Sequence, residues 1–250
     1  MRTLDAEHYV MEARLLRERV PTFGEYPFSL PVLQNFQRLE LHPAVTFLVG
    51  ENGSGKSTLL EAVATAWGFN PEGGGKNFRF STRTSHSVLH EYLRLSKTFR
   101  RPKDGFFLRA ESFFNVATEI ERLDEGPGGP PIIDSYGGQS LHEQSHGESF
   151  FSLMTHRFRG DGFYVLDEPE AALSPARQLA MLRRLHELVR QRSQFIIATH
   201  SPLLLSYPDA WIYQITDQGL ERVRYEDTEH YELTRGFLNN PQSYLRNLLD

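Results

Sequence analysis

The chain of 250 residues contains no cysteine, and this absence excludes several kinds of chemistry at once. Disulfide bridges, cysteine-based zinc sites and thiol nucleophiles are ruled out. The apolar runs, such as 163–166 and 195–198, are only as long as strands, well short of the roughly 20 residues that cross a bilayer. The first residues also lack the apolar segment of a secretory signal. We therefore expect a cytoplasmic protein with no membrane insertion of its own.

An excess of positive charge is missing too, since 27 lysines and arginines face 32 aspartates and glutamates, for a net charge of −5. This balance argues against a protein whose whole surface binds nucleic acid, although it allows a local basic patch. Hydrophobic residues make up 39% of the chain and charged residues 24%, which is ordinary for a globular protein. The length suits one large α/β domain or two small ones.

Short apolar runs alternate with helix-like segments along much of the chain. Strands are predicted at 44–49, 162–166, 194–198 and 210–215, and helices at 57–67, at 175–192 and after Pro202. Strands that alternate with helices are typical of a mostly parallel sheet. We therefore expect an α/β fold with such a sheet at its centre.

Other segments have patterns of their own. The stretch 1–43 is rich in strand-like pieces, and the alternating residues 89–99, a turn and the strand 106–110 predict a hairpin. The polar tail 226–250 is predicted to be helical and broken at Pro241, and it carries no readable chemistry.

An amphipathic helix is predicted to lead into the strand 162–166. Phe150, Leu153, Met154 and Phe158 have the spacing of one helix face. The helix therefore begins near residue 145.

A glycine-rich turn follows the apolar run 44–49. Its sequence, Gly-Glu-Asn-Gly-Ser-Gly-Lys-Ser at 50–57, fits the phosphate-loop pattern at every fixed position. Glycines let successive N–H groups point inward, and the positive end of the next helix adds to the attraction for phosphate. A chance glycine-rich turn is the alternative, and the strand-then-helix setting argues against it. The residues predicted to contact the nucleotide are Gly50, Glu51, Asn52, Gly53, Ser54, Gly55, Lys56, Ser57 and Thr58.

Two of these residues have specific predicted roles. Lys56 is expected to reach the β- and γ-phosphates as a catalytic group, and Ser57 to offer its hydroxyl oxygen to Mg²⁺.

Two carboxylates follow the apolar strand 162–166. Neighbouring residues on a strand point to opposite sides, so Asp167 can face the metal while Glu168 faces the attacking water. Asp167 is expected to hold Mg²⁺, and Glu168 to orient or deprotonate the water. A solvated strand end is the alternative for such a pair, and the nearby phosphate loop weighs against it.

A histidine follows the apolar strand 194–198. His200 could donate to the γ-phosphate and sense its loss, although a lone histidine at a strand end is more often structural. Three strand ends, at Gly50, Asp167 and His200, all present polar groups. Because ligands of open α/β sheets bind at the carboxyl edge, the functional interpretation is favoured.

Together these motifs resemble those of the ABC ATPase superfamily. The similarity runs through 47–58, 144–174 and 195–202, and is strongest to small stand-alone AAA-labelled ATPases related to the heads of SMC and RecF proteins. The resemblance implies a P-loop NTPase fold of the ABC type. A mostly parallel core sheet would be joined by an antiparallel β subregion and a helical signature subregion. It also implies hydrolysis of ATP, with Mg²⁺ as cofactor.

The resemblance further implies a signature segment at the start of the amphipathic helix. Ser145 and Gly147 fit that segment, whereas His146 and Glu148 replace its usual glycine and glutamine. A competing match lies at 136–139, but the helix begins at Ser145 and leads directly into the acidic strand. In the family this segment meets ATP bound by another subunit, which predicts a head-to-tail homodimer that sandwiches two ATP molecules.

The sequence departs from the family pattern in two places. The family usually carries a glutamine after a strand between the phosphate loop and the signature segment, but no glutamine lies between Ser57 and Gln139 here. Glu111 is the best substitute, and it could equally be an ordinary surface glutamate. Ser174 stands where the loop after the acidic pair often carries aspartate. That loop, 169–174, is unlike its counterpart in transporter ATPases and favours the SMC-like branch.

The expected organisation is one ABC-type ATPase domain over 1–250. A β-rich part covers 1–43, the P-loop core covers 44–68 and 160–225, an inserted arm and signature subregion covers 69–159, and a tail covers 226–250. The residue that stacks on adenine is left open among Phe23, Tyr26, Phe28 and Phe36.

We expect ATP to close the dimer and hydrolysis to release it, acting on DNA or on a partner protein in genome maintenance or defence. A locally basic stretch could follow phosphates, or could be a solvated face; it comprises Arg79, Arg83, Arg94, Lys97, Arg100, Arg101 and Lys103. The alternative is the ATPase subunit of a membrane ABC transporter. A small-molecule kinase is a third class, against which the Ser145 helix and His200 argue.

Overall fold

A computed structural model describes residues 8–75, 87–110, 113–124, 131–140, 142, 146–216 and 218–249. Its centre is a six-stranded sheet in the order β5-β6-β7-β3-β8-β9. The strands are β5 (Asp104–Arg109), β6 (Gly162–Asp167), β7 (Gln194–Ala198), β3 (Val45–Val49), β8 (Trp211–Thr216) and β9 (Gly219–Val223). The first five strands run parallel, and β9 is antiparallel to β8. The expected mostly parallel sheet is confirmed.

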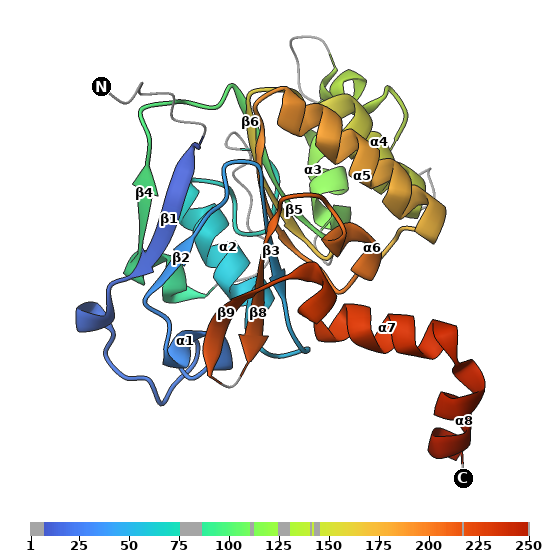
Figure 1. The fold of residues 1–250 in the computed structure, drawn as a ribbon. Coiled ribbons are helices and arrows are strands. Elements are labelled where there is room, and N and C mark those ends of the chain that lie inside the picture. The colour runs from blue at the N-terminus through green and yellow to red at the C-terminus, as the bar shows by residue number, and fades with distance from the viewer. Residues whose placement is uncertain are drawn as a thin grey trace, which may run out of the picture.

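A second, three-stranded antiparallel sheet covers one side of the molecule (Figure 1). Its order is β2-β1-β4, with β1 (Val10–Leu15), β2 (Arg38–Glu40) and β4 (Leu93–Lys97). Helix α2 (Lys56–Trp67) lies between the two sheets. The expected antiparallel β subregion is therefore present.

The predicted hairpin of 89–99 with 106–110 is wrong. Strand β4 pairs with β1, while β5 pairs in parallel with β6 at the edge of the central sheet. The side chains explain the separation: Phe106, Phe107 and Leu108 are buried on both faces of β5, as in a strand of a covered parallel sheet. In β4 Leu93 is buried, whereas Arg94 and Lys97 are exposed, as in a strand with one solvent-exposed face.

The core consists of two layers, one on each face of the central sheet. Alternate residues supply them: Val45, Phe47 and Val49 of β3 face one layer, and Leu48 faces the other. The first layer packs against α3 (Phe113–Asp124), α4 (His146–Ser152), a π-helical turn η5 (Leu153–Arg157) and α5 (Pro175–Arg190). The second packs against α2 and the antiparallel sheet. The predicted amphipathic face is confirmed, since Phe150, Leu153, Met154 and Phe158 are all buried.

Short helices and turns complete the chain. They are η1 (Arg17–Arg19), α1 (Pro31–Gln34), η2 (Val88–Tyr92), η4 (Ile132–Tyr136), α6 (Pro202–Leu205) and η6 (Tyr225–Asp227). The tail forms α7 (Glu229–Asn239) and α8 (Pro241–Leu249), which extend away from the body of the molecule (Figure 1). Pro241 stands at the break between them, where the sequence predicts it.

Candidate functional site

The candidate site lies at the carboxyl edge of the central sheet, where β3, β6 and β7 end side by side. Because these strands are parallel neighbours, the residues that follow them meet although they are far apart in the sequence. The loop 50–55 follows β3, the pair Asp167 and Glu168 ends β6, and His200 follows β7.

The loop after β3 curls tightly onto the start of α2. Gly55 has a φ of 100°, and a Cβ placed there would come within 2.6 Å of Val32 Cγ1, so only glycine fits. Lys56 is 4% exposed, and its Nζ donates to the carbonyls of Gly50 and Glu51 at 2.7 and 2.8 Å. Burial lowers the pKa of Lys56, against the attraction of Glu168, Asp167 and Glu170.

The chemistry of this edge fits a nucleotide. Buried side-chain atoms without a hydrogen-bond partner among the described residues include Ser54 Oγ, Glu170 Oε2, His200 Nε2 and Gln214 Oε1, all on this edge. Such orphaned polar atoms are costly unless a ligand or water pairs with them. The N–H groups of the first turn of α2 add donors that have no partner within the helix. The loop can therefore bind the phosphates of ATP.

Asp167 and Ser57 present adjacent oxygens. Phe163, Val165 and Asp167 share the face of β6 that packs toward α2, and Ser57 Oγ donates to Asp167 Oδ1 at 3.0 Å. Hydroxyl and carboxylate oxygens are ligands that Mg²⁺ prefers. The pair could hold that ion beside the phosphate loop.

Arg109 is a neighbour of this pair that the sequence interpretation missed. It ends β5, opposite Asp167 in the register, and its Nε lies 3.7 Å from Asp167 Oδ2. Its Nη1 forms a 2.6 Å ion pair with Glu61 of α2. The parallel pairing of β5 with β6 creates this contact, so the wrong hairpin prediction concealed it. The proposed substitute Glu111 lies outside the described residues.

Glu168 turns sharply out of the strand. Its backbone has a φ of 49°, rare for a non-glycine residue, and its N–H donates to Ala198 O at 2.9 Å. Its side chain is 40% exposed, and Oε1 lies 3.6 Å from His200 Nε2. Glu168 and His200, two of the three predicted catalytic residues, therefore face each other at the open edge of the sheet.

A second carboxylate supports the histidine loop. Glu170 Oε1 accepts a 2.6 Å hydrogen bond from the N–H of His200. Burial raises the pKa of Glu170. This contact ties the loop after β6 to the loop after β7.

His230, from the tail, is another residue that the sequence did not point to. Its Nε2 lies 3.0 Å from Nδ1 of His200. It is the second residue of α7, 30 positions beyond His200, and no motif marks it.

The signature segment is only partly described. Ser145 lies outside the described residues, while Gly147 is buried in the first turn of α4. A Cβ on Gly147 would meet Ala172 O at 2.4 Å, so the start of α4 packs tightly against the loop 169–174. The signature segment and the loop after the acidic pair are thus neighbours.

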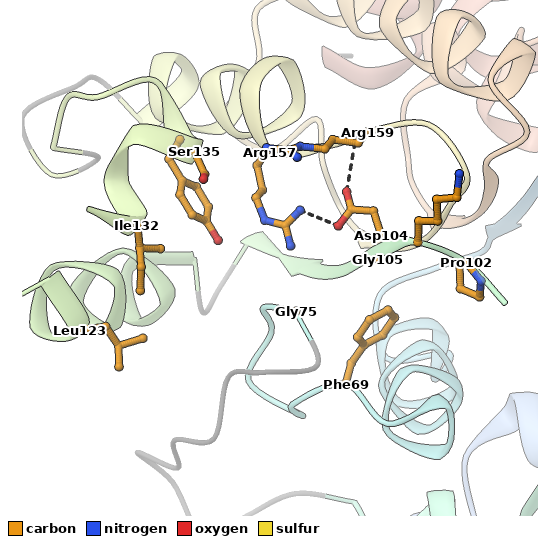
Figure 2. A pocket seen from close by; sticks show the side chains of 12 residues that line it. Phe69, Gly75, Pro102, Asp104, Gly105, Leu123, Ile132, Ser135, Arg157 and Arg159 are labelled. Atoms are coloured by element: carbon orange, nitrogen blue, oxygen red, sulfur yellow. Dashed lines mark hydrogen bonds and ion pairs between the residues drawn. The ribbon is translucent and has the colours of Figure 1, made fainter. Parts of the chain in front are cut away.

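A separate pocket lies at the opposite, amino edge of the sheet, where β5 begins (Figure 2). Asp104 in its lining accepts hydrogen bonds from Arg157 Nη1 at 2.5 Å, the backbone N–H of Arg159 at 3.0 Å and the Tyr164 hydroxyl at 2.7 Å. The parallel strands place this pocket away from the phosphate loop, so we do not assign it to the nucleotide.

Two family models match this chain. Residues 133–206 match the family described as "AAA domain, putative AbiEii toxin, Type IV TA system", and residues 23–126 match one described as "AAA domain". Among the described residues, no helix combines the length and the apolar character needed to cross a membrane.

Relatives include both transport and chromosome proteins. ABC transporter G family member STR2 of Medicago truncatula is 28% identical over 172 residues, and the match covers 63% of this chain and 24% of the relative. Chromosome partition protein Smc of Mycolicibacterium paratuberculosis is 46% identical over 63 residues, or 25% of this chain and 5% of the relative. The probable branched-chain amino acid transport ATP-binding protein LivG of Archaeoglobus fulgidus is 24% identical over 232 residues, and the match covers 80% of this chain and 82% of the relative. The chain thus spans only a small part of STR2 and Smc.

A solved structure agrees in fold. CbiO1 of Clostridium perfringens, part of an ABC transporter complex, superposes with a TM-score of 0.50 over 94% of this chain and 97% of its own, at 14% identity. The two AAA-domain matches, this shared fold and the strand-end arrangement above support a P-loop ATPase of the ABC type, related to SMC and RecF heads.

Proposed function

We propose that this chain binds ATP with Mg²⁺ at the carboxyl edge of the central sheet, hydrolyses it, and thereby switches a head-to-tail homodimer that acts on DNA or a partner protein in the cytoplasm. The observation that carries the proposal is the convergence of three strand ends, which brings Lys56, the Ser57–Asp167 pair and the Glu168–His200 pair to one place.

Each residue has a distinct part in this proposal. Lys56 leaves the two loop carbonyls and binds the β- and γ-phosphate oxygens. Ser57 and Asp167 would hold Mg²⁺, which would supply positive charge against the phosphates. Glu168, aimed outward by its left-handed backbone, orients the attacking water and accepts its proton. His200 donates from Nε2 to the γ-phosphate.

The resemblance of the signature segment to that of the ABC family is the reason for proposing the dimer. The start of α4 packs against the loop 169–174, which follows Glu168 in the chain. A two-fold pair would bring Ser145 and Gly147 of one copy to the ATP of the other and make the two sites alike. Helix N-termini bind anions well, which suits the contact with phosphate.

The molar mass of Glu168→Gln in solution, with and without ATP and Mg²⁺, tests the proposal. We expect the 28.8 kDa chain to be a monomer alone and a dimer with ATP, because the substitution keeps binding while it blocks hydrolysis. Adding Ser145→Arg should abolish the dimer but not ATP binding. The matched control, Ser243→Arg on exposed α8, should still dimerise. ATP binding without any change in mass would contradict the shared-site mechanism.

Exposed basic residues on β4 favour DNA as the partner on which the ATPase acts. Arg94 and Lys97 are exposed on β4, and Lys97 lies over the ring of Trp67, with Nζ 4.6 Å from the centroid. Lys103, by contrast, is paired with Asp161 at 3.2 Å, and Arg79 and Arg83 lie outside the described residues. The relative named for chromosome partition supports this direction.

DNA affinity should depend steeply on salt if this surface binds phosphates. For about four phosphate contacts, we expect affinity to fall about 100-fold between roughly 50 and 200 mM salt. The double substitution Arg94→Ala and Lys97→Ala should reduce both the affinity for DNA and the steepness with which that affinity falls as salt rises. Arg183→Ala on α5 should change neither. Fluorescence anisotropy with a labelled duplex measures both. An affinity that is flat in salt would eliminate DNA as the partner of this surface.

The ATPase subunit of a membrane transporter is the second candidate. The match to LivG, which covers most of both chains, favours it. Copurification of this chain with a membrane protein would support transport. The loop 169–174, unlike that of transporter ATPases, favours the first proposal.

A further inference from the structure

The histidine after β7 is paired with a second histidine from the tail. His200 Nδ1 and His230 Nε2 are 3.0 Å apart, with ring centroids 5.2 Å apart at 45°. Two contacts hold His230 in place. The buried Thr228 hydroxyl caps α7 by accepting from Tyr231 N at 3.3 Å, and the Tyr225 hydroxyl donates to Pro202 O at 2.9 Å. The pair is therefore a built contact rather than a chance approach of a loose tail.

A hydrogen bond between two neutral imidazoles couples their tautomers, because the nitrogen that donates must face a nitrogen that accepts. Burial is the main cause that lowers the pKa of both His200 and His230, and nearby Lys56 lowers them further, against the opposing pull of Glu168 on His200 and of Glu229 on His230. The lowered pKa values favour the neutral form of both rings, in which each ring has one N–H. Only one of the two facing nitrogens can donate.

The surroundings of His200 select the direction. Its Nε2 is buried without a hydrogen-bond partner among the described residues, and it lies 3.6 Å from the carboxylate oxygen Oε1 of Glu168. A lone pair on Nε2 would face that carboxylate, and the proposed γ-phosphate, with repulsion. An N–H there would face both with attraction. His200 then accepts at Nδ1, and His230 donates from Nε2.

We propose that His230 is a positioning residue that holds His200 with its proton on Nε2, directed at the γ-phosphate position. The proposal rests on the function proposed above. It goes beyond that function by giving α7 a part in the ATPase site. Partners that orient a functional histidine through its other nitrogen typically change activity about 10- to 100-fold when they are removed, as known from metal sites.

The test begins with the full-length protein without nucleotide. The ¹⁵N signals of His200 should show Nδ1 as a hydrogen-bonded acceptor and Nε2 as protonated. His230→Gln keeps a donor amide at this position and should preserve the pattern, whereas His230→Leu should lose the acceptor shift at Nδ1. A wild-type spectrum with the proton of His200 on Nδ1 would overturn the proposal. This readout does not depend on hydrolysis or dimerisation, so it decides the role of His230 even if the proposed function fails.

Steady-state ATPase measurements supply the second arm. His230→Leu should lower kcat about 10- to 100-fold with KM within about threefold of wild type, because the contact matters most as charge develops on the γ-phosphate. His230→Gln should restore kcat to within about threefold. Glu232→Gln, at an exposed position of α7, is the control and should match wild type. An equal loss in Glu232→Gln, or no loss in His230→Leu, would overturn the positioning role.

Discussion

Glu168→Gln is expected to slow ATP hydrolysis by about 10²- to 10⁴-fold, the usual contribution of a general base. The amide keeps the shape of the side chain but cannot accept a proton from water. The left-handed backbone at Glu168 and the bond from its N–H to Ala198 O are unaffected, so the strand end should keep its form. Affinity for ATP should stay within about threefold of wild type, since Lys56 and the loop are unchanged.

Phosphate release and ATP titration on the same preparation separate these two effects. Glu187→Gln, on the outer side of α5 and paired there with Arg183, is the matched control and should hydrolyse ATP as wild type does. A Glu168→Gln protein with undiminished turnover would assign the base to another group. Glu170 would then be the first to examine, because it is the next carboxylate along the chain and it contacts the backbone of His200.

Lys56→Ala is expected to weaken ATP binding about 10²- to 10³-fold. Each hydrogen bond to a charged group contributes about 1.5–3 kcal/mol, and Lys56 is positioned to serve two phosphates. A loss of about 3–4 kcal/mol corresponds to that range. The side chain is almost completely buried in the loop, so no neighbouring cation can take its place without rearrangement.

Calorimetric titration with ATP and Mg²⁺ measures this loss directly. Arg183→Ala removes a positive charge from the exposed face of α5 and should leave ATP affinity unchanged. If Lys56→Ala bound ATP within about threefold of wild type, the loop 50–57 would not be the phosphate site, and the strand-end arrangement would need another explanation.

The sequence alone determined the elements whose signals are local. A phosphate loop is a strand, a turn and a helix in direct succession, so the pattern at 50–57 is readable without knowledge of the rest of the fold. The apolar strands before Asp167 and His200 are equally local. Their convergence followed from the rule that parallel strands end at one edge.

Only the tertiary structure decided which strands pair and which distant side chains meet. The residues 89–110 contain two adjacent strands, yet burial of both faces draws β5 into the central sheet while β4 joins β1. That choice brings Arg109 beside Asp167. The position of the start of α7 beside the loop that follows β7 likewise brings His230 to His200. Such contacts depend on the free energy of burying whole surfaces, which no short stretch of sequence records.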